Sequence, residues 1–196
     1  HNGDAVSTEG GTVVTIQGWN FGSRSNRIDA VTYGVNGDGY TARDCEISAL
    51  DTAIECRTPS AVGRDLRWRV SVGGQVSDHG GAASYAAPAI VEVLPVNGVP
   101  SEGGLLTLVG TEFAHEYAEI NPEAIQVKWG SAELVVEVVR TAEREGLQEI
   151  IAKAGPGMQR PAALTVSHLV WSADRRNVLQ RVPSNAVVVD YAAPAI

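Results

Sequence analysis

The fold is decided by one stretch near the start of the chain, Gly10-Gly11-Thr12-Val13-Val14-Thr15-Ile16-Gln17-Gly18-Trp19-Asn20-Phe21-Gly22. Its centre alternates with period two, so Val14 and Ile16 share one face of a predicted strand. Gly18 and Gly22 then bracket a sharp corner, because glycine tolerates a positive φ or a close approach that other residues do not. Phe21 is free to anchor this corner in the core. The stretch therefore predicts a β-strand that ends in a packed corner.

The same pattern recurs in the second half of the chain. The offset between the copies ranges from 92 residues, at Gly18 and Gly110, to 106 residues, at Tyr85 and Tyr191. Because the matched blocks keep one order, they predict two tandem modules, with Gly110 and Phe113 at the second corner. The matched blocks are Glu9–Gly11 with Glu102–Gly104, Gly18–Gly22 with Gly110–Ala114, Val31–Gly34 with Val127–Gly130, Val70–Val72 with Leu164–Val166, and Tyr85–Ile90 with Tyr191–Ile196.

The rest of the chain is typical of an all-β protein. Its 21 glycines and 9 prolines separate short runs rich in Val, Ile, Leu and Thr. In Arg67–Val72 the apolar and basic residues alternate, and in Glu133–Arg140 we expect Leu134, Val136 and Val138 to share a face. The segment Arg140–Glu149 could be helical, but Gly146 favours a hairpin turn there. We also expect a hairpin tip at 36–39, and the pattern as a whole predicts antiparallel β-sandwiches.

The repeat also predicts the domain boundaries. We expect a first module at residues 1–87, a second at 88–192, and the start of a linker or third module at 193–196. The inter-module linker contains Tyr85, Pro88 and Ile90, since proline cannot donate to a strand ladder and Ile90 opens the next strand. The identical hexapeptide at the end of the chain predicts that this sequence is part of a longer repeat protein.

Charge and composition weigh against several functions. The net charge of −8 and the presence of only two lysines argue against binding to nucleic acid, which depends on clustered basic residues. No apolar run approaches the roughly 20 residues of a membrane-spanning helix, so no direct membrane insertion is expected. None of the four histidines lies in a recognisable motif, and His168 is expected to be a half-buried strand residue. The sequence predicts no catalytic residue, no cofactor and no metal site.

Two cysteines, Cys45 and Cys56, flank a turn-like segment at 49–52. A hairpin there would bring them opposite each other within bonding reach. Taken alone, the spacing leaves two possibilities, a disulfide and a pair of free thiols.

These motifs resemble the IPT/TIG family, the immunoglobulin-like fold shared by plexins and Rel-type transcription factors. The hallmark Gly-Gly-Thr-x-Val-Thr-Ile-x-Gly-x-Asn-Phe-Gly matches residues 10–22, including Asn20. Secreted members often continue with the pattern found here at Cys45, Ser48, Asp51-Thr52, Ile54, Cys56 and Thr58-Pro59. The resemblance implies that Cys45 and Cys56 pair and that the chain is extracellular or at the cell surface. The second module has Glu112 in place of Asn20 and lacks both cysteines.

The resemblance implies a non-enzymatic module for adhesion or recognition at the cell surface, with a protein or glycan partner. One alternative is a structural building block of an extracellular filament, wall or sheath, in which neighbouring copies are the partners. Another is an accessory domain of a secreted carbohydrate-active enzyme. A DNA-binding Rel-type module is disfavoured by the acidic charge and the cysteine pair. We expect the Trp and Phe side chains to pack in cores or corners, with Trp171 as the exception.

Overall fold

The computed structural model describes residues 5–78, 80–95, 98–156, 161–172 and 175–190. The chain divides into two compact units, which are described separately here. Unit 1 comprises His1–Ala86 with Ser172–Leu179, and unit 2 comprises Ala87–Trp171 with Gln180–Ile196. Nearly all regular structure is antiparallel β-strand, which confirms the predicted all-β, immunoglobulin-like sandwich class.

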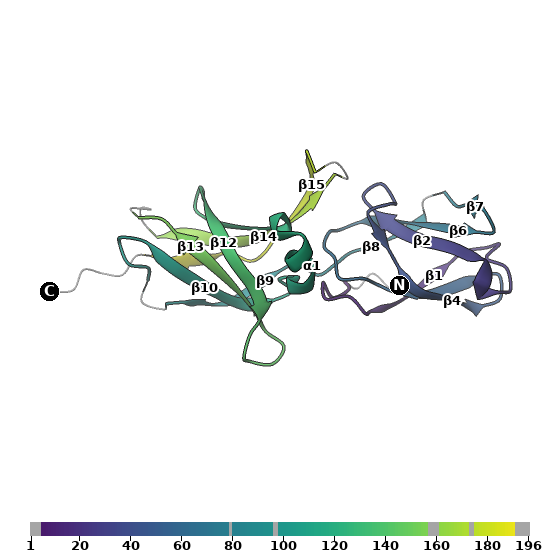
Figure 1. Cartoon of the computed structure of the whole chain (residues 1–196), viewed down its shortest axis with the longest axis horizontal. Helices are drawn as coiled ribbons and strands as arrows, with labels where there is room; N and C mark the ends of the chain where they lie inside the picture. Colours follow the sequence, from purple (N-terminus) through teal and green to yellow (C-terminus); the bar gives the residue numbers. More distant parts are fainter. Residues whose placement is uncertain (1–4, 79, 96–97, 157–160, 173–174, 191–196) are drawn as a thin grey trace. The chain divides into compact units, whose positions relative to one another are not determined.

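Unit 1 is a sandwich of two sheets (Figure 1). Its elements are β1 (Val13–Gln17), η1 (Ser25–Arg27), β2 (Ile28–Gly34), β3 (Tyr40–Thr41), β4 (Arg43–Ala49), β5 (Ala53–Arg57), β6 (Leu66–Val72), β7 (Gln75–Val76) and β8 (Gly80–Ala83). One sheet has the order β1-β5-β4. The other has the order β3-β2-β6-β7, and β8 also pairs with β6. The predicted hairpin tip at 36–39 is confirmed by the pairing of Tyr33 with Tyr40.

The core of unit 1 follows from strand alternation. Trp68 and Val70 of β6 are buried, whereas Arg67, which precedes Trp68 and points to the opposite side of the strand, is exposed. Next to this face, the hydroxyl groups of the buried Tyr33 and Tyr85 lie 2.5 Å apart. Tyr85 donates its own proton to the Pro59 carbonyl oxygen at 2.8 Å, so Tyr33 is the donor of the pair. Burial raises the pKa of Tyr33, which therefore stays protonated.

Unit 2 contains the longer strands. Its elements are β9 (Ala89–Leu94), β10 (Gly104–Thr111), α1 (His115–Ile120), η2 (Pro122–Ala124), β11 (Ile125–Trp129), β12 (Ala132–Thr141), β13 (Gln148–Ala154), β14 (Ala162–Trp171), β15 (Val178–Pro183) and β16 (Val187–Val189). The strand order is β15-β14-β11-β12-β13-β10-β9, with β16 paired to β14. The start of β12 pairs with β11 and its remainder pairs with β13. Strand β12 therefore joins the β15-β14-β11 part of the sheet to the β13-β10-β9 part (Figure 1).

A bulge in β12 corrects the predicted face assignment. The register with β13 shifts between Val136 and Val138. An extra residue reverses the side-chain alternation beyond it. Val138 is therefore 41% exposed, and Val139 packs against the core in its place. The hairpin predicted over Arg140–Glu149 is confirmed, because β12 and β13 pair on both sides of its turn.

Helix α1 was not predicted from the sequence. It has six residues, too few to show a helical period, and it follows Ala114 in the left-handed conformation at φ +55°. No helix in the described part of the chain has the length and apolar character to span a membrane.

The predicted linker residues belong to three environments. Tyr85 is a core residue of unit 1, and Pro88 precedes β9. Ile90 lies in the core of unit 2. There the Ile90 N–H donates to Oδ1 of Asn185 at 2.7 Å, and the Ile90 carbonyl accepts from Nδ2 of the same side chain at 2.9 Å. The side-chain amide of Asn185 thus binds both backbone groups of Ile90, in the first strand of unit 2.

His168 in β14 is fully buried, not half-buried as predicted. Burial lowers the pKa of its imidazole from 6.5 to about 4, while the backbone of Glu112 opposes this shift. An unfolded chain therefore binds this proton more readily than the folded one. The contribution of neutral His168 to the free energy of unfolding is complete above pH 6.5, and it is lost as the pH falls from there toward 4.

We expect acid to destabilise unit 2 through His168. Lowering the pH from 7 to 5 should cost about 2 kcal/mol from this residue alone. Chemical denaturation of the native chain and of His168→Leu at both pH values measures the term, because the variant should lack this part of the pH dependence. An equal pH dependence in the two proteins would contradict the expectation.

Candidate functional site

The corner after β1 is built around Phe21. A Cβ atom on Gly18 would lie only 2.5 Å from Cζ of the Phe21 ring, so the ring occupies the space that a side chain would need. Asn20 and Gly22 both take left-handed backbone conformations, at φ +64° and +78°. These two positions turn the chain so that Phe21 points back and is buried.

Hydrogen bonds join this corner to the turn between β4 and β5. The Gly18 N–H donates to the Thr52 carbonyl at 3.0 Å, and the Gly22 N–H donates to Oδ1 of Asp51, also at 3.0 Å. In return the Asp51 N–H donates to the Gly22 carbonyl at 2.8 Å. Asp51-Thr52 belongs to a motif of the sequence, but no sequence pattern indicated that these two residues hold the corner. The motif at residues 10–22 and the motif at residues 45–59 thus meet here, and their hydrogen bonds fix the corner.

The cysteines lie in the strands that carry this turn. Cys45 in β4 and Cys56 in β5 form a disulfide, with their Cα atoms 4.1 Å apart. The β4–β5 register shifts between Arg43 and Glu46, around Cys45. The disulfide that the resemblance implied is present, and it cross-links the hairpin that holds the corner.

Trp19 contradicts the expectation that the Trp side chains pack in cores or corners. It is 81% exposed, whereas Trp68 and Trp129 are buried. Strand alternation explains the difference, because Val14, Ile16 and Gly18 face inward and the next residue faces outward. Trp171, the expected exception, is partly buried and donates its indole N–H to the Glu123 carbonyl at 3.0 Å.

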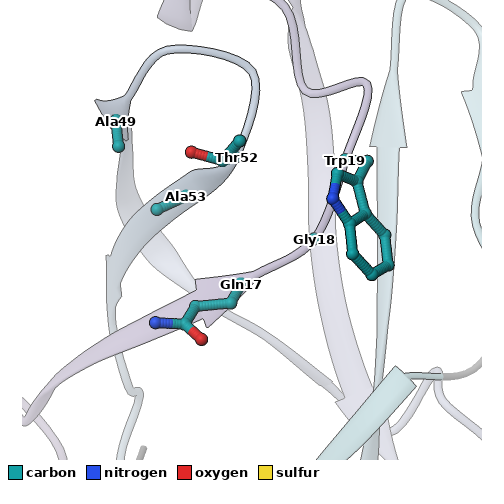
Figure 2. Close-up of a pocket in the computed structure, with 6 residues that line it drawn as sticks. All are labelled: Gln17, Gly18, Trp19, Ala49, Thr52 and Ala53. Atoms are coloured by element: carbon teal, nitrogen blue, oxygen red, sulfur yellow. The ribbon is translucent and has the colours of Figure 1, made fainter.

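A cleft of about 390 Å³ lies beside Trp19. Figure 2 shows the indole of Trp19 on the right, Ala49, Thr52 and Ala53 at the upper left, and the carboxamide of Gln17 below Ala53. Among the described residues that line this cleft, none carries a carboxylate, imidazole, thiol or amine. The cleft therefore offers an aromatic face, an amide and a hydroxyl, which can bind a ligand but supply no general acid or base.

Unit 2 has a corner of the same build. A Cβ atom on Gly110 would lie 2.5 Å from Cζ of Phe113 and would overlap the Ala89 carbonyl oxygen. Glu112 takes the left-handed conformation of its counterpart Asn20, at φ +56°. The N–H of the buried Phe113 donates to Oε1 of Gln148, a contact that no sequence pattern indicated.

Neither described histidine lines the cleft beside Trp19. His115 begins α1, and its Nδ1 lies 3.3 Å from Nε2 of Gln148. His168 is buried in β14. His1 and His79 lie outside the described residues.

The corner, the cross-linked hairpin and the sandwich all fall within the segment that matches a known family. A model described as the IPT/TIG domain matches residues 4–85. Residues 4–85 form an IPT/TIG domain. Trp19 and its cleft therefore belong to the IPT/TIG domain, on its exposed corner.

Comparison with solved structures gives matches of low similarity that extend over most of this chain. Two structures of the full extracellular region of plexin A4 match at 18% and 16% identity, with TM-scores of 0.39 and 0.36. SGBP-B, from a complex xyloglucan utilization locus in Bacteroides uniformis, matches at 16% identity with a TM-score of 0.35. Each match covers 95% of this chain, but only 17%, 15% and 47% of the respective structures. The chain thus spans less than half the length of each of these proteins.

Proposed function

We propose that this chain is a non-enzymatic extracellular module that recognises a partner at the cell surface through Trp19 of its IPT/TIG domain. The observation that carries the proposal is the 81% exposure of Trp19 on a corner held by backbone hydrogen bonds and a disulfide. A tryptophan loses little conformational entropy on binding because it has only two side-chain torsions, and tryptophan is enriched among residues that dominate binding energy.

The extracellular location is supported by the disulfide between Cys45 and Cys56. Disulfides persist in oxidising compartments and are rare where glutathione and thioredoxin keep thiols reduced. A structural cross-link in the hairpin behind the recognition corner therefore favours a protein that works outside the cytosol.

A glycan is the partner that the cleft fits best. The indole of Trp19 offers a flat apolar face on which the C–H face of a sugar ring can stack. Gln17 and Thr52 of the same cleft supply an amide and a hydroxyl that can bond to sugar hydroxyls. A protein partner would more often meet a tryptophan surrounded by other apolar side chains.

We also propose that unit 2 is a second copy of the IPT/TIG domain. The support is its corner, where Gly110, Glu112 and Phe113 repeat the conformations and contacts of Gly18, Asn20 and Phe21. Unit 2 has Thr111 where unit 1 has Trp19. The copies therefore share a scaffold and differ at the residue proposed to recognise the partner.

We expect Trp19→Ala to lower binding to immobilised cell-surface polysaccharides by at least about tenfold, the effect of removing a residue that dominates an interface. Binding is measured on a panel of glycans with the native chain, Trp19→Ala and Leu50→Ala. Leu50 is 72% exposed in the same unit and serves as the matched control. Because both side chains are exposed, both variants should unfold within about 0.5 kcal/mol of the native chain.

Three results would speak against the proposal. Binding unaffected by Trp19→Ala would remove Trp19 from the site, and equal losses in both variants would point to nonspecific apolar contact. No binding to any glycan, together with Trp19-dependent binding to a purified surface protein, would keep the function but replace the glycan by a protein.

A further inference from the structure

Strand β6 of unit 1 carries two arginines on its outer face. Trp68 between them is buried, and strand side chains alternate, so Arg67 and Arg69 both point away from the core. Their Cα atoms lie about 7 Å apart, because an extended strand rises about 3.4 Å per residue. The two guanidinium groups therefore share one surface of the sheet β3-β2-β6-β7.

The sheet around these arginines is made of small side chains. Gly34 of β2 and Ala82 of β8 lie on either side of Arg67. Thr32 of β2 lies opposite Arg69. None of these three neighbours is large enough to cover a guanidinium group. The five residues form a flat surface, the arginine patch, that a ligand can approach.

The positive charges of the arginine patch are not neutralised within it. Neither Arg67 nor Arg69 forms an ion pair with a carboxylate of the residues that the structure describes. Asp29 lies near Ser71, the next outward residue of β6, but its Oδ2 accepts from the Ser71 hydroxyl at 3.2 Å and from the Gly74 N–H at 2.7 Å. Both guanidinium groups can therefore pair with a bound anion.

The Nε of Arg69 is a buried donor without an acceptor. It is shielded from solvent, and no described residue accepts a hydrogen bond from it. Such atoms are rare, because each costs the free energy of removing a polar group from water. Turning the guanidinium toward an anion gives this donor an acceptor, and within the described part of the chain it breaks no hydrogen bond of the side chain. The unbound side chain is therefore poised to bind an anion.

We propose that Arg67 and Arg69 bind an acidic polysaccharide through carboxylates on its sugars. A guanidinium group binds a carboxylate with two parallel hydrogen bonds. The exposed Thr41, which pairs with Thr32 at the border of the patch, offers a hydroxyl to the sugar hydroxyls. A protein partner is disfavoured, because the cores of protein interfaces are apolar and rich in aromatic residues, whereas the neighbours in this patch are glycine, alanine and threonine.

This binding goes beyond the proposed recognition by Trp19. The cleft beside Trp19 is lined from β1, β4, β5 and their turns, and it shares no residue with the arginine patch. Either proposal can therefore fail without the other. A polymer with one carboxylate per sugar is also a sparser polyanion than nucleic acid, which the net charge of −8 repels.

The test uses the full chain and oligosaccharides of galacturonic acid of a single length. A matched set has every carboxylate converted to its methyl ester, which removes the charge and keeps the backbone. An oligo-glutamate peptide with the same number of carboxylates stands for an acidic protein. Titration calorimetry measures binding to the native chain, to the double variant Arg67→Gln, Arg69→Gln, and to the control Arg24→Gln, Arg43→Gln. Arg24 and Arg43 are exposed in the same unit, so both double variants lose the same net charge.

We expect saturable binding of the acidic oligosaccharide to the native chain, with a Kd below about 1 mM. Esterification of the ligand and the change at Arg67 and Arg69 should each weaken binding by at least about tenfold, because each removes the charge-assisted hydrogen bonds. The control variant should bind within about threefold of the native chain, since its changed charges are distant and screened.

Four results would overturn the proposal. They are no saturable binding of the acidic oligosaccharide at about 1 mM, equal affinity for the acid and its ester, equal losses in the two double variants, and binding of oligo-glutamate as tight as that of the oligosaccharide. The comparison of acid with ester uses the native chain, so it decides the question even if the change at Arg67 and Arg69 impairs folding.

Discussion

Replacing Gly110 by alanine is expected to unfold unit 2 at temperatures where unit 1 stays folded. The new methyl group would overlap the Ala89 carbonyl oxygen and lie 2.5 Å from the Phe113 ring, which is fully buried. The carbonyl belongs to the backbone of β9 and cannot rotate away, so β9 must leave β10. We expect a loss of about 3 kcal/mol, at the upper end of the usual range for overpacking a core. Calorimetry should show one of two transitions move sharply down.

Two matched glycine variants separate this clash from a general effect of alanine. A Cβ on Gly155 would meet nothing within 4 Å, so Gly155→Ala should leave stability within about 0.5 kcal/mol of native. Gly18→Ala should have an intermediate effect in unit 1, because the obstacle there is a ring that can shift. If Gly110→Ala and Gly155→Ala were equally mild, the close approach of β9 to β10 would not be a source of stability.

Removal of the disulfide should have an effect of similar size, confined to unit 1. The bond closes a loop of 11 residues' separation, for which chain entropy predicts a loss of about 3 kcal/mol. The double variant Cys45→Ala, Cys56→Ala avoids a lone thiol, and it should lower the transition of unit 1 while leaving that of unit 2 in place. Reductant added to the native chain should reproduce the shift, but should not affect the double variant. An unchanged unit 1 would mean that the hairpin hydrogen bonds suffice without the bond.

The corners could be predicted from sequence because they depend on local geometry. A glycine that makes room for a ring three residues later leaves a fixed spacing, as in Gly18 with Phe21 and Gly110 with Phe113. The strand class was predictable for a similar reason, since alternation is a property of consecutive residues. The module boundaries and the number of modules in the parent protein stay predictions.

The remaining features depend on partners far apart in the chain. The bulge that exposes Val138 is set by the register with β13, and alternation read along β12 alone cannot show it. Asp51 holds the Gly22 corner across 29 residues of sequence. The alternation of β1 places the Trp19 side chain outward, but its large apolar surface suggested that it packs in the core.

The hydrogen bonds between Ile90 and Asn185 have a consequence for synthesis on the ribosome. Strand β9 emerges first, but the side chain that satisfies Ile90 lies 95 residues later. In unit 1 Val6 is likewise tied to the far end of its unit, through Ser84 and Ala86. Each unit can thus close only after its final segment has been translated, and until then its first apolar residues remain open to chaperones or to a neighbouring nascent chain.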